Sequence, residues 1–310
     1  MNRFILWLKW NYWRLQQKLK TRGAEEKKIK AKQNYDDYRI KHLKLGVFYS
    51  LFDGEELLES SIKCLRDFAD YICVGFQDVS YTGQQNDTDL RPFLADLKSR
   101  GLIDDFFLFK PDFSKSPTQN ERAKRNIGLK KCRLHGCKYF MNLDTDEFFI
   151  KDEFKNAAVK FLDLKAECSA AHVKCYVKEP DYLAETSDLF HSAELFCPFL
   201  FKIRLFSKCG GYSPLRMDPT RFLNGTKKFY LFSNNEINMH HMATVRKNLK
   251  KKYENSAANG DSERGKLIQN YYKRIIDWKY PEDYINLDGE KIKVTKVENI
   301  FNIDTSAWGE

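Results

Sequence analysis

Two aspartates, Asp144 and Asp146, are the residues of this chain best placed to do chemistry. They come directly after the apolar run 139–143 and directly before Glu147. Alternate side chains of a strand share one face, so a regular strand would align both carboxylates, and a turn at Thr145 would equally bring both to one ion. Carboxylate oxygens suit Mg²⁺ or Mn²⁺, which usually keep waters and also bind a substrate phosphate. The pattern predicts a metal–phosphate site; the alternative is a strand end whose acids lie in solvent or cap the next helix.

The region before this pair alternates between strand-like and helical patterns. Apolar runs typical of buried strands occupy 44–51, 71–76, 106–109 and 139–143, and helical spacing occupies 57–68, 90–99 and 117 to about 136. Apolar strands that alternate with helices predict an α/β fold, with a mixed, mainly parallel sheet flanked by helices on both faces. Ligands of such sheets bind at the carboxyl ends of strands, where Gln77 and Asp78 also lie.

The helix that precedes the aspartates has a strong start signal. Residues 116–119 read Ser-Pro-Thr-Gln, which predicts a capping box with proline in the first turn. Asn126 and Gly128 are expected to pack this helix on the sheet, and Asp53 is expected to cap the helix after the first strand. The three basic residues of the helix are expected to lie on its solvated face: Arg122, Lys124 and Arg125.

After Asp146 the pattern becomes less regular. Strand-like runs follow at 170–177, 199–206 and 228–232, and a late His240-His241 pair precedes Arg246. The expected organisation is an N-terminal arm at 1–43, a catalytic domain at 44–260 with a nucleotide half up to about 150 and an acceptor half beyond it, and a C-terminal helical extension at 261–310.

The basic charge of the chain is concentrated in its first residues. Of a net charge of +10, residues 1–44 hold +9, from thirteen Lys or Arg against four Asp or Glu. This placement argues against a nucleic-acid partner, which a basic surface on the folded body would favour. Trp7, Trp10 and Trp13 lie among the basic residues and suit an anionic membrane surface. The alternative is a helix packed on the domain or on a second subunit.

The arm does not have the pattern of a membrane span or an export signal. Its longest apolar run, 4–8, is far shorter than the ~20 residues of a spanning helix, and no small-residue cleavage site follows it. The eight cysteines have no zinc-ligand spacing, so reduced thiols are the simplest account. We therefore expect a cytoplasmic protein, held peripherally on the inner face of the cytoplasmic membrane.

These features together resemble a known family. The strand–helix order, the run RAKRNIGLKK before YFMNLDTDEFF, and the late His-His before an Arg are similar to GT-A glycosyltransferases, in particular the family-2-like branch of bacterial lipopolysaccharide and surface-polysaccharide enzymes. The likeness covers about residues 45–249. It implies metal-dependent, inverting transfer of a sugar from a nucleotide-diphospho-sugar to a glycan or lipid-linked acceptor in cell-surface polysaccharide biosynthesis.

The resemblance also implies roles for single residues. Asp144 and Asp146 would bind Mn²⁺ or Mg²⁺ that bridges the donor diphosphate, and His240 or His241 would complete the metal or phosphate site. Asp78 would contact the base or ribose. Here the usual D-D-x-S-x-D-x-T after the second strand is replaced by the run QDVSYT at 77–82, which leaves the identity of the nucleotide open.

The departing diphosphate requires positive charge, and the acceptor hydroxyl requires a base. Besides the ion, Arg246 and Arg125 are candidates to bind the donor phosphates. Asp218, in a Pro-flanked loop, is the preferred general base, with Asp188 and Glu194 as other candidates. The alternative for Asp218 is a turn-forming aspartate before proline.

Two other classes of function remain open on the sequence. One is nucleotidyl transfer on the same fold, which differs in whether nucleotide or sugar appears on the product. The other is a non-catalytic, membrane-associated scaffold in which the Asp-x-Asp motif is inert. Binding of nucleotide diphosphate that depends on Mn²⁺ separates the enzymes from the scaffold.

Overall fold

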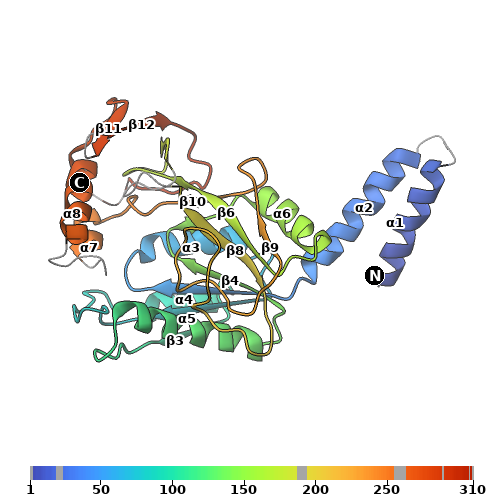
Figure 1. Cartoon of the computed structure of the whole chain (residues 1–310), viewed down its shortest axis with the longest axis horizontal. Helices are drawn as coiled ribbons and strands as arrows, with labels where there is room; N and C mark the ends of the chain where they lie inside the picture. Colours follow the sequence, from blue (N-terminus) through green and yellow to red (C-terminus); the bar gives the residue numbers. More distant parts are fainter. Residues whose placement is uncertain are drawn as a thin grey trace.

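The computed structural model describes residues 3–18, 24–186, 194–254, 263–287, 290–306 and 308. Figure 1 shows a body built on a sheet, from which a pair of N-terminal helices projects at one end. These helices are α1 (Arg3–Lys18) and α2 (Ala24–Lys41), which pack against each other. The basic arm is therefore a helical hairpin, and the body begins after it.

The first half of the body has the strands and helices expected from the sequence. Its elements are β1 (Leu45–Leu51), α3 (Glu55–Leu65), β2 (Tyr71–Phe76), α4 (Arg91–Ser99), β3 (Asp105–Leu108), α5 (Pro117–Leu134) and β4 (Tyr139–Asp144). The strands pair in parallel in the order β3-β2-β1-β4. The predicted capping box is present, since the Ser116 hydroxyl accepts from the Gln119 amide at 3.3 Å and the Gln119 side chain accepts from the Ser116 amide at 2.9 Å.

The second half extends the same sheet with mixed directions. Its elements are β5 (Glu147–Phe148), α6 (Lys151–Asp163), β6 (Cys168–Cys175), β8 (Phe196–Lys202), β9 (Phe229–Leu231) and β10 (Asn238–His241). Strand β8 lies antiparallel between β4 and β6, β10 and β9 pair in parallel with β6, and β5 closes the far edge. The predicted α/β class, with a mixed and mainly parallel sheet flanked by helices, is confirmed by this topology.

The C-terminal part differs from the expected helical extension. Its described residues form one helix, α8 (Glu263–Asp277), and two strands, β11 (Tyr284–Leu287) and β12 (Glu290–Lys296), which join β7 (Tyr182–Ala184) in a small antiparallel sheet. A short helix, α7 (Leu249–Glu254), lies before this part of the chain. The physical reason lies in the alternation of polar and apolar residues around Ile292 and Val294, which is the period of a strand. Val294 and Ile285 are buried accordingly.

Alternate side chains of β1 enter two different apolar layers. Val47 and Tyr49 pack in the layer that contains α3, α4 and α6, whereas Phe48 packs in the layer that contains α5. This two-sided burial explains why the strand reads as a continuous apolar run. It also fixes where the strands end, and therefore where the polar residues that follow β1, β2 and β4 lie.

A close approach of α5 to the sheet depends on Gly128. A β-carbon at this position would lie 2.1 Å from the Cδ2 atom of Phe48, whose ring is fully buried. The expected packing role of Gly128 is therefore confirmed. Asn126, two residues earlier, holds a neighbouring loop, because its side-chain oxygen accepts from the Cys209 amide at 2.8 Å.

We predict that Gly128→Ala lowers the free energy of unfolding by about 1–3 kcal/mol, because the new methyl group overpacks the layer under α5. Alanine is favoured over glycine in a helix by about 1 kcal/mol, so a net loss would show that the clash outweighs propensity. Chemical unfolding measures the difference. The exposed Lys130→Ala on the same helix is the control, expected within about 0.5 kcal/mol of wild type. Equal stability of Gly128→Ala and wild type would contradict this packing.

Candidate active site

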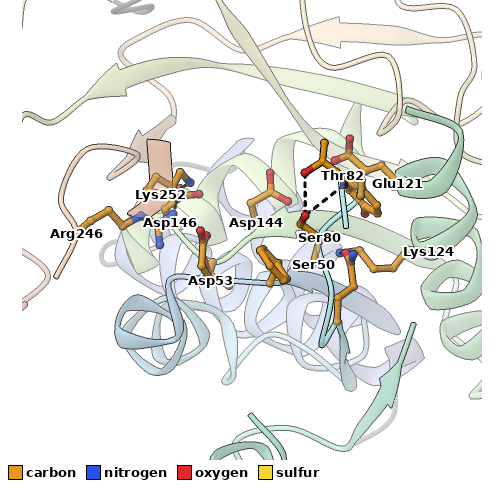
Figure 2. A pocket seen from close by; sticks show the side chains of 14 residues that line it. Ser50, Asp53, Ser80, Thr82, Glu121, Lys124, Asp144, Asp146, Arg246 and Lys252 are labelled. Atoms are coloured by element: carbon orange, nitrogen blue, oxygen red, sulfur yellow. Dashed lines mark hydrogen bonds and ion pairs between the residues drawn. The ribbon is translucent and has the colours of Figure 1, made fainter. Parts of the chain in front are cut away.

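A pocket of about 240 Å³ lies beyond the carboxyl ends of β1, β2 and β4. Its lining residues are Ser50, Phe52, Asp53, Gln77, Ser80, Tyr81, Thr82, Glu121, Lys124, Asp144, Thr145, Asp146, Arg246 and Lys252. Figure 2 shows Asp144 in the middle, with Asp146, Arg246 and Lys252 on one side and Lys124 on the other. The pocket therefore occupies the edge of the sheet where parallel α/β folds bind ligands.

The two aspartates reach this pocket by a turn. Asp144 ends β4, and Thr145 and Asp146 form a turn before β5, so both carboxylates line the same cavity. Of the two sequence alternatives, the turn at Thr145 is the one found. Asp53, expected to cap α3, lines the pocket too, because Gly54 takes the N-cap position with a φ of 83°.

Asp144 is held by two arginines from distant parts of the chain. One carboxylate oxygen accepts from Arg125 Nη2 at 3.0 Å, and the other accepts from Arg221 Nη2. Burial opposes ionisation of this carboxyl, but Arg125 and Arg221 outweigh it and lower the pKa of Asp144 to about 2. Asp144 is therefore a carboxylate throughout the physiological range.

Asp146 is buried and meets basic groups from the late chain. Its Oδ2 atom accepts from Lys252 Nζ at 3.0 Å and from Arg246 Nη2, and its Oδ1 atom lies 3.8 Å from His241 Nε2. Burial raises the pKa of Asp146, but Lys252 and Arg246 bring it well below its usual range. The carboxylate is ionised and already compensated by protein charge.

The sequence predicted a solvated face for three basic residues of α5, Arg122, Lys124 and Arg125, but two of them do not lie on one. Lys124 and Arg125 are buried, because the side chains find polar partners inside the fold. Arg125 donates from Nη1 to the Asn142 side chain at 2.7 Å and stands behind Asp144, outside the pocket lining. We therefore describe Arg125 as a positioning residue for Asp144, whereas Arg122 is exposed as expected.

Lys124, by contrast, lines the pocket. Its Nζ donates to Gln77 Oε1 at 2.5 Å and lies 5.3 Å from the centre of the Tyr81 ring. Burial lowers the pKa of Lys124 to about 7, since removing an ammonium from water favours its neutral form.

Of the two residues expected at the site after β2, Gln77 faces the pocket and Asp78 does not. Gln77 is buried and lines the pocket, whereas the Asp78 carboxylate pairs with Arg91 at 2.5 Å on the outside. Adjacent residues of an extended chain point in opposite directions, so only one of the two can face the cavity. The expectation for Asp78 is wrong in this respect.

The two histidines are separated in the same way. His241 points toward Asp146, and burial lowers its pKa, so its imidazole is neutral near neutral pH. His240 lies on the other face, where its Nδ1 atom is 2.8 Å from the Tyr176 hydroxyl and its ring contacts Phe301. His240 is therefore a packing residue, and its predicted place at the ion is wrong.

The predicted base, Asp218, is brought beside the aspartate pair. Its Oδ2 atom lies 3.2 Å from Arg221 Nε and 3.5 Å from Arg125 Nη2, the same arginines that hold Asp144. Glu147 is the other partner of Arg221, at 2.6 and 2.8 Å. Burial raises the pKa of Glu147 to about 7 despite this contact.

Of the two other candidate bases, Glu194 does not belong to this group. Glu194 pairs with His172 Nδ1 at 2.7 Å, away from the pocket lining. Asp188 lies outside the described residues.

Sequence reasoning missed Arg221 and Lys252. Arg221 follows Asp218 by three residues in an irregular loop, and Lys252 ends the run 250–252 of three lysines, so neither stands in a recognisable motif. Arg246 was expected at the site and lies there, and its Nε and Nη1 atoms are buried without a hydrogen-bond partner among the described residues. Buried donors of this kind are usually satisfied, and an anion would satisfy them.

A Mg²⁺ or Mn²⁺ ion fits the residues present when substrate oxygens complete its coordination. Asp144 and Asp146 are ionised oxygen donors on one pocket wall. Within the described part of the chain, no group of three or more His, Cys, Asp or Glu is arranged to hold an ion by itself. Such ions commonly take one or two carboxylates and complete their shell with waters and phosphates. The pair therefore suits an ion shared with a phosphorylated substrate.

Comparison with known proteins gives a limited result. No family model and no curated protein matches the chain. Among solved structures, S. aureus TarS is 12% identical over 77% of this chain and 44% of that chain, with a TM-score of 0.37. Its fragment 1–349 in complex with UDP-GlcNAc is 13% identical over 74% of this chain and 72% of that chain, with a TM-score of 0.38. GalNAc-T7 with UDP, GalNAc and Mn²⁺ is 13% identical over 79% and 59%, with a TM-score of 0.38.

This chain thus spans less than half the length of the longer TarS structure. At this level of similarity, the function has to be inferred from the residues of the chain itself.

We predict opposite effects for the two histidines. His241→Ala should weaken binding of a nucleotide diphosphate in the presence of Mn²⁺ by about 10–100-fold, the usual effect of losing a group beside a metal ligand. His240→Ala should leave that affinity unchanged and lower the free energy of unfolding by about 1–3 kcal/mol, because the Tyr176 hydroxyl loses its buried partner.

Calorimetric titration measures the affinity, and chemical unfolding measures the stability, of both variants. Each variant serves as the control for the other. Loss of donor affinity in His240→Ala, with His241→Ala unaffected, would reverse the assignment.

Proposed function

We propose that this chain is a metal-dependent glycosyltransferase that uses a nucleotide-diphospho-sugar donor. The observation that supports this most is the convergence of two ionised carboxylates, Asp144 and Asp146, with Arg246 and Lys252 in one pocket at the strand ends. A sugar–phosphate bond breaks to leave a diphosphate, so a site for this reaction needs both an ion and cationic donors.

The charge of the pocket supports the need for an ion. Four carboxylates line it, and only three basic side chains oppose them: Asp53, Glu121, Asp144 and Asp146 against Lys124, Arg246 and Lys252. A diphosphate would meet a pocket that carries no excess of positive charge. A divalent ion on Asp144 and Asp146 would supply the missing charge and stabilise the leaving diphosphate.

The basic residues beside the aspartates are suited to bind the phosphates. Arg246 has two buried nitrogens that find no hydrogen-bond partner in the part of the chain that the structure describes, and Lys252 is supplied by α7. The Asp146 charge raises the pKa of Lys252 against the effect of burial, so this side chain is an ammonium. Both groups can donate charge-assisted hydrogen bonds to phosphate oxygens.

The opposite end of the pocket is suited to a nucleoside. Tyr81 presents an aromatic side chain there, beside Lys124, and Ser80 and Thr82 present polar ones. Aromatic faces stack on bases, and the polar groups can bond the base edge and ribose. We assign the nucleoside to this end and the diphosphate to the end that holds Arg246.

The acceptor reaction is proposed to proceed with inversion. Asp218 is the candidate base, because it is the carboxylate that shares Arg125 and Arg221 with Asp144 while remaining outside the pocket lining. The acceptor is proposed to be a glycan or lipid-linked sugar of a cell-surface polysaccharide such as lipopolysaccharide, which rests on the resemblance carried by YFMNLDTDEFF.

The donor site is tested by a panel of nucleotide sugars in thermal unfolding, with Mn²⁺ or with EDTA. A specific donor at about 100 times its dissociation constant should stabilise the chain by about 2.7 kcal/mol, and only with Mn²⁺. Asp144→Asn should remove this effect. Asp144 is preferred over Asp146 because its carboxylate is 36% exposed. Neutralising the buried Asp146 would leave the charges of Arg246 and Lys252 without their carboxylate partner.

The exposed Asp67→Asn is the matched control. Equal stabilisation in EDTA would contradict the metal role, and transfer of nucleotide rather than sugar to the product would contradict the reaction.

We predict that Asp218→Asn lowers turnover by about 10²–10⁴-fold, the usual contribution of a general base, while donor affinity stays unchanged. The amide keeps one oxygen, which can still accept from the Thr220 amide in place of Oδ1, and Arg221, which loses the acceptor at Oδ2, keeps its contacts with Asp144 and Glu147. Sugar transfer and donor titration are measured on the same preparation, with Glu194→Gln as the control. Turnover within twofold of wild type would place the base elsewhere.

A further inference from the structure

Helix α1 carries a concentration of exposed apolar side chains. Seventeen large apolar residues are exposed among those whose side chains the structure describes, and six of them belong to this one sixteen-residue helix. The six are 44–61% exposed: Phe4, Ile5, Trp7, Leu8, Tyr12 and Leu15. Contiguous exposed patches of this kind mark interaction surfaces.

The helix already buries its opposite face. Leu6 is buried, Trp10 and Trp13 are half-buried, and the ammonium of Lys27 on α2 lies 4.9 Å from the centre of the Trp13 ring. Trp13 therefore packs on α2, and Leu6 and Trp10 lie on the same side of the helix at 100° per residue. The outer face is a second apolar surface, and contact with α2 does not explain it.

Basic residues border the outer face on both sides. With about 100° per residue, Lys9 lies beyond Ile5 on one side, and Arg3 and Arg14 lie beyond Trp7 on the other. These three side chains are exposed, and α1 contains no acidic residue. The chemistry that complements this helix is apolar in the middle and anionic at the edges.

The hairpin is held so that it presents this face. In Figure 1 it extends away from the body, with α2 nearer to α6. Arg39 of α2 pairs with Asp163 at 2.7 Å, and Lys155 of α6 pairs with Asp37 at 2.5 Å. The attachment uses α2, so the outer face of α1 stays exposed.

We propose that the outer face of α1 binds the surface of an anionic lipid bilayer. Trp7 and Leu8 would enter the boundary between headgroups and acyl chains, and Lys9 and Arg14 would meet the anionic headgroups. None of the helices within the described residues is long and apolar enough to span a bilayer, so the mode is attachment in the plane of the surface.

A second copy of the chain suits this face less well. Two α1 helices packed face to face would bring the basic borders of both together, and neither helix has an acidic side chain to meet them. Lipid binding is also independent of the proposed reaction, so its test measures attachment and needs no substrate.

The test is co-sedimentation of the full chain with vesicles of phosphatidylcholine, with or without about a third of phosphatidylglycerol. Wild type should bind the anionic vesicles and release as salt rises. Trp7→Ser/Leu8→Ser should reduce binding by about tenfold or more, because the inserted apolar area is lost. Lys9→Gln/Arg14→Gln should reduce it by about fivefold for each charge removed.

The matched control is Leu205→Ser/Phe206→Ser, which removes two side chains that are 74% and 82% exposed elsewhere on the molecule. This variant should bind anionic vesicles like wild type, and all variants should keep the thermal stability of wild type. Equal binding by Trp7→Ser/Leu8→Ser and wild type would overturn the proposal. So would equal binding to neutral vesicles, or a lipid-free dimer that the same substitutions disrupt.

Discussion

The site depends on the compensation of charge around Asp144 and Asp146. Each carboxylate accepts from two basic side chains, and these come from α5, from the loop before β9 and from the segment after β10. Ionised groups removed from water are costly unless they are paired. These contacts therefore restrict the conformations that the segment 221–252 can adopt. The motif therefore organises the second half of the body as well as the pocket.

The same constraint explains why basic side chains near the site pair with carboxylates of the protein itself. Arg125 and Arg221 lie behind Asp144 and also hold Glu121, Glu147 and Asp218. They fix the carboxylates but have little capacity left for a substrate. Arg246 and Lys252 differ, because they line the pocket and both contact Asp146. A divalent ion would compete with them for Asp146 and free them for phosphate, which links metal and donor binding.

Local pattern was enough to predict the first half of the fold, because apolar strands, the capping box at 116–119 and the aspartate pair all have short-range signals. The failures concern contacts made over long separations. Lys252 is 106 residues from Asp146 and Arg221 is 77 from Asp144, so nothing in the neighbouring sequence marks them. Likewise Arg125 looked solvated only because its buried partner Asn142 belongs to another element.

Anomalous diffraction at the manganese edge, from crystals grown with Mn²⁺ and a nucleotide diphosphate, tests the central claim most directly. The predicted result is a single metal peak beside the carboxylates of Asp144 and Asp146, with the diphosphate bound to that ion and within hydrogen-bond reach of Arg246 and Lys252. A diphosphate that occupies the pocket with no metal peak, or a peak remote from both aspartates, would contradict it.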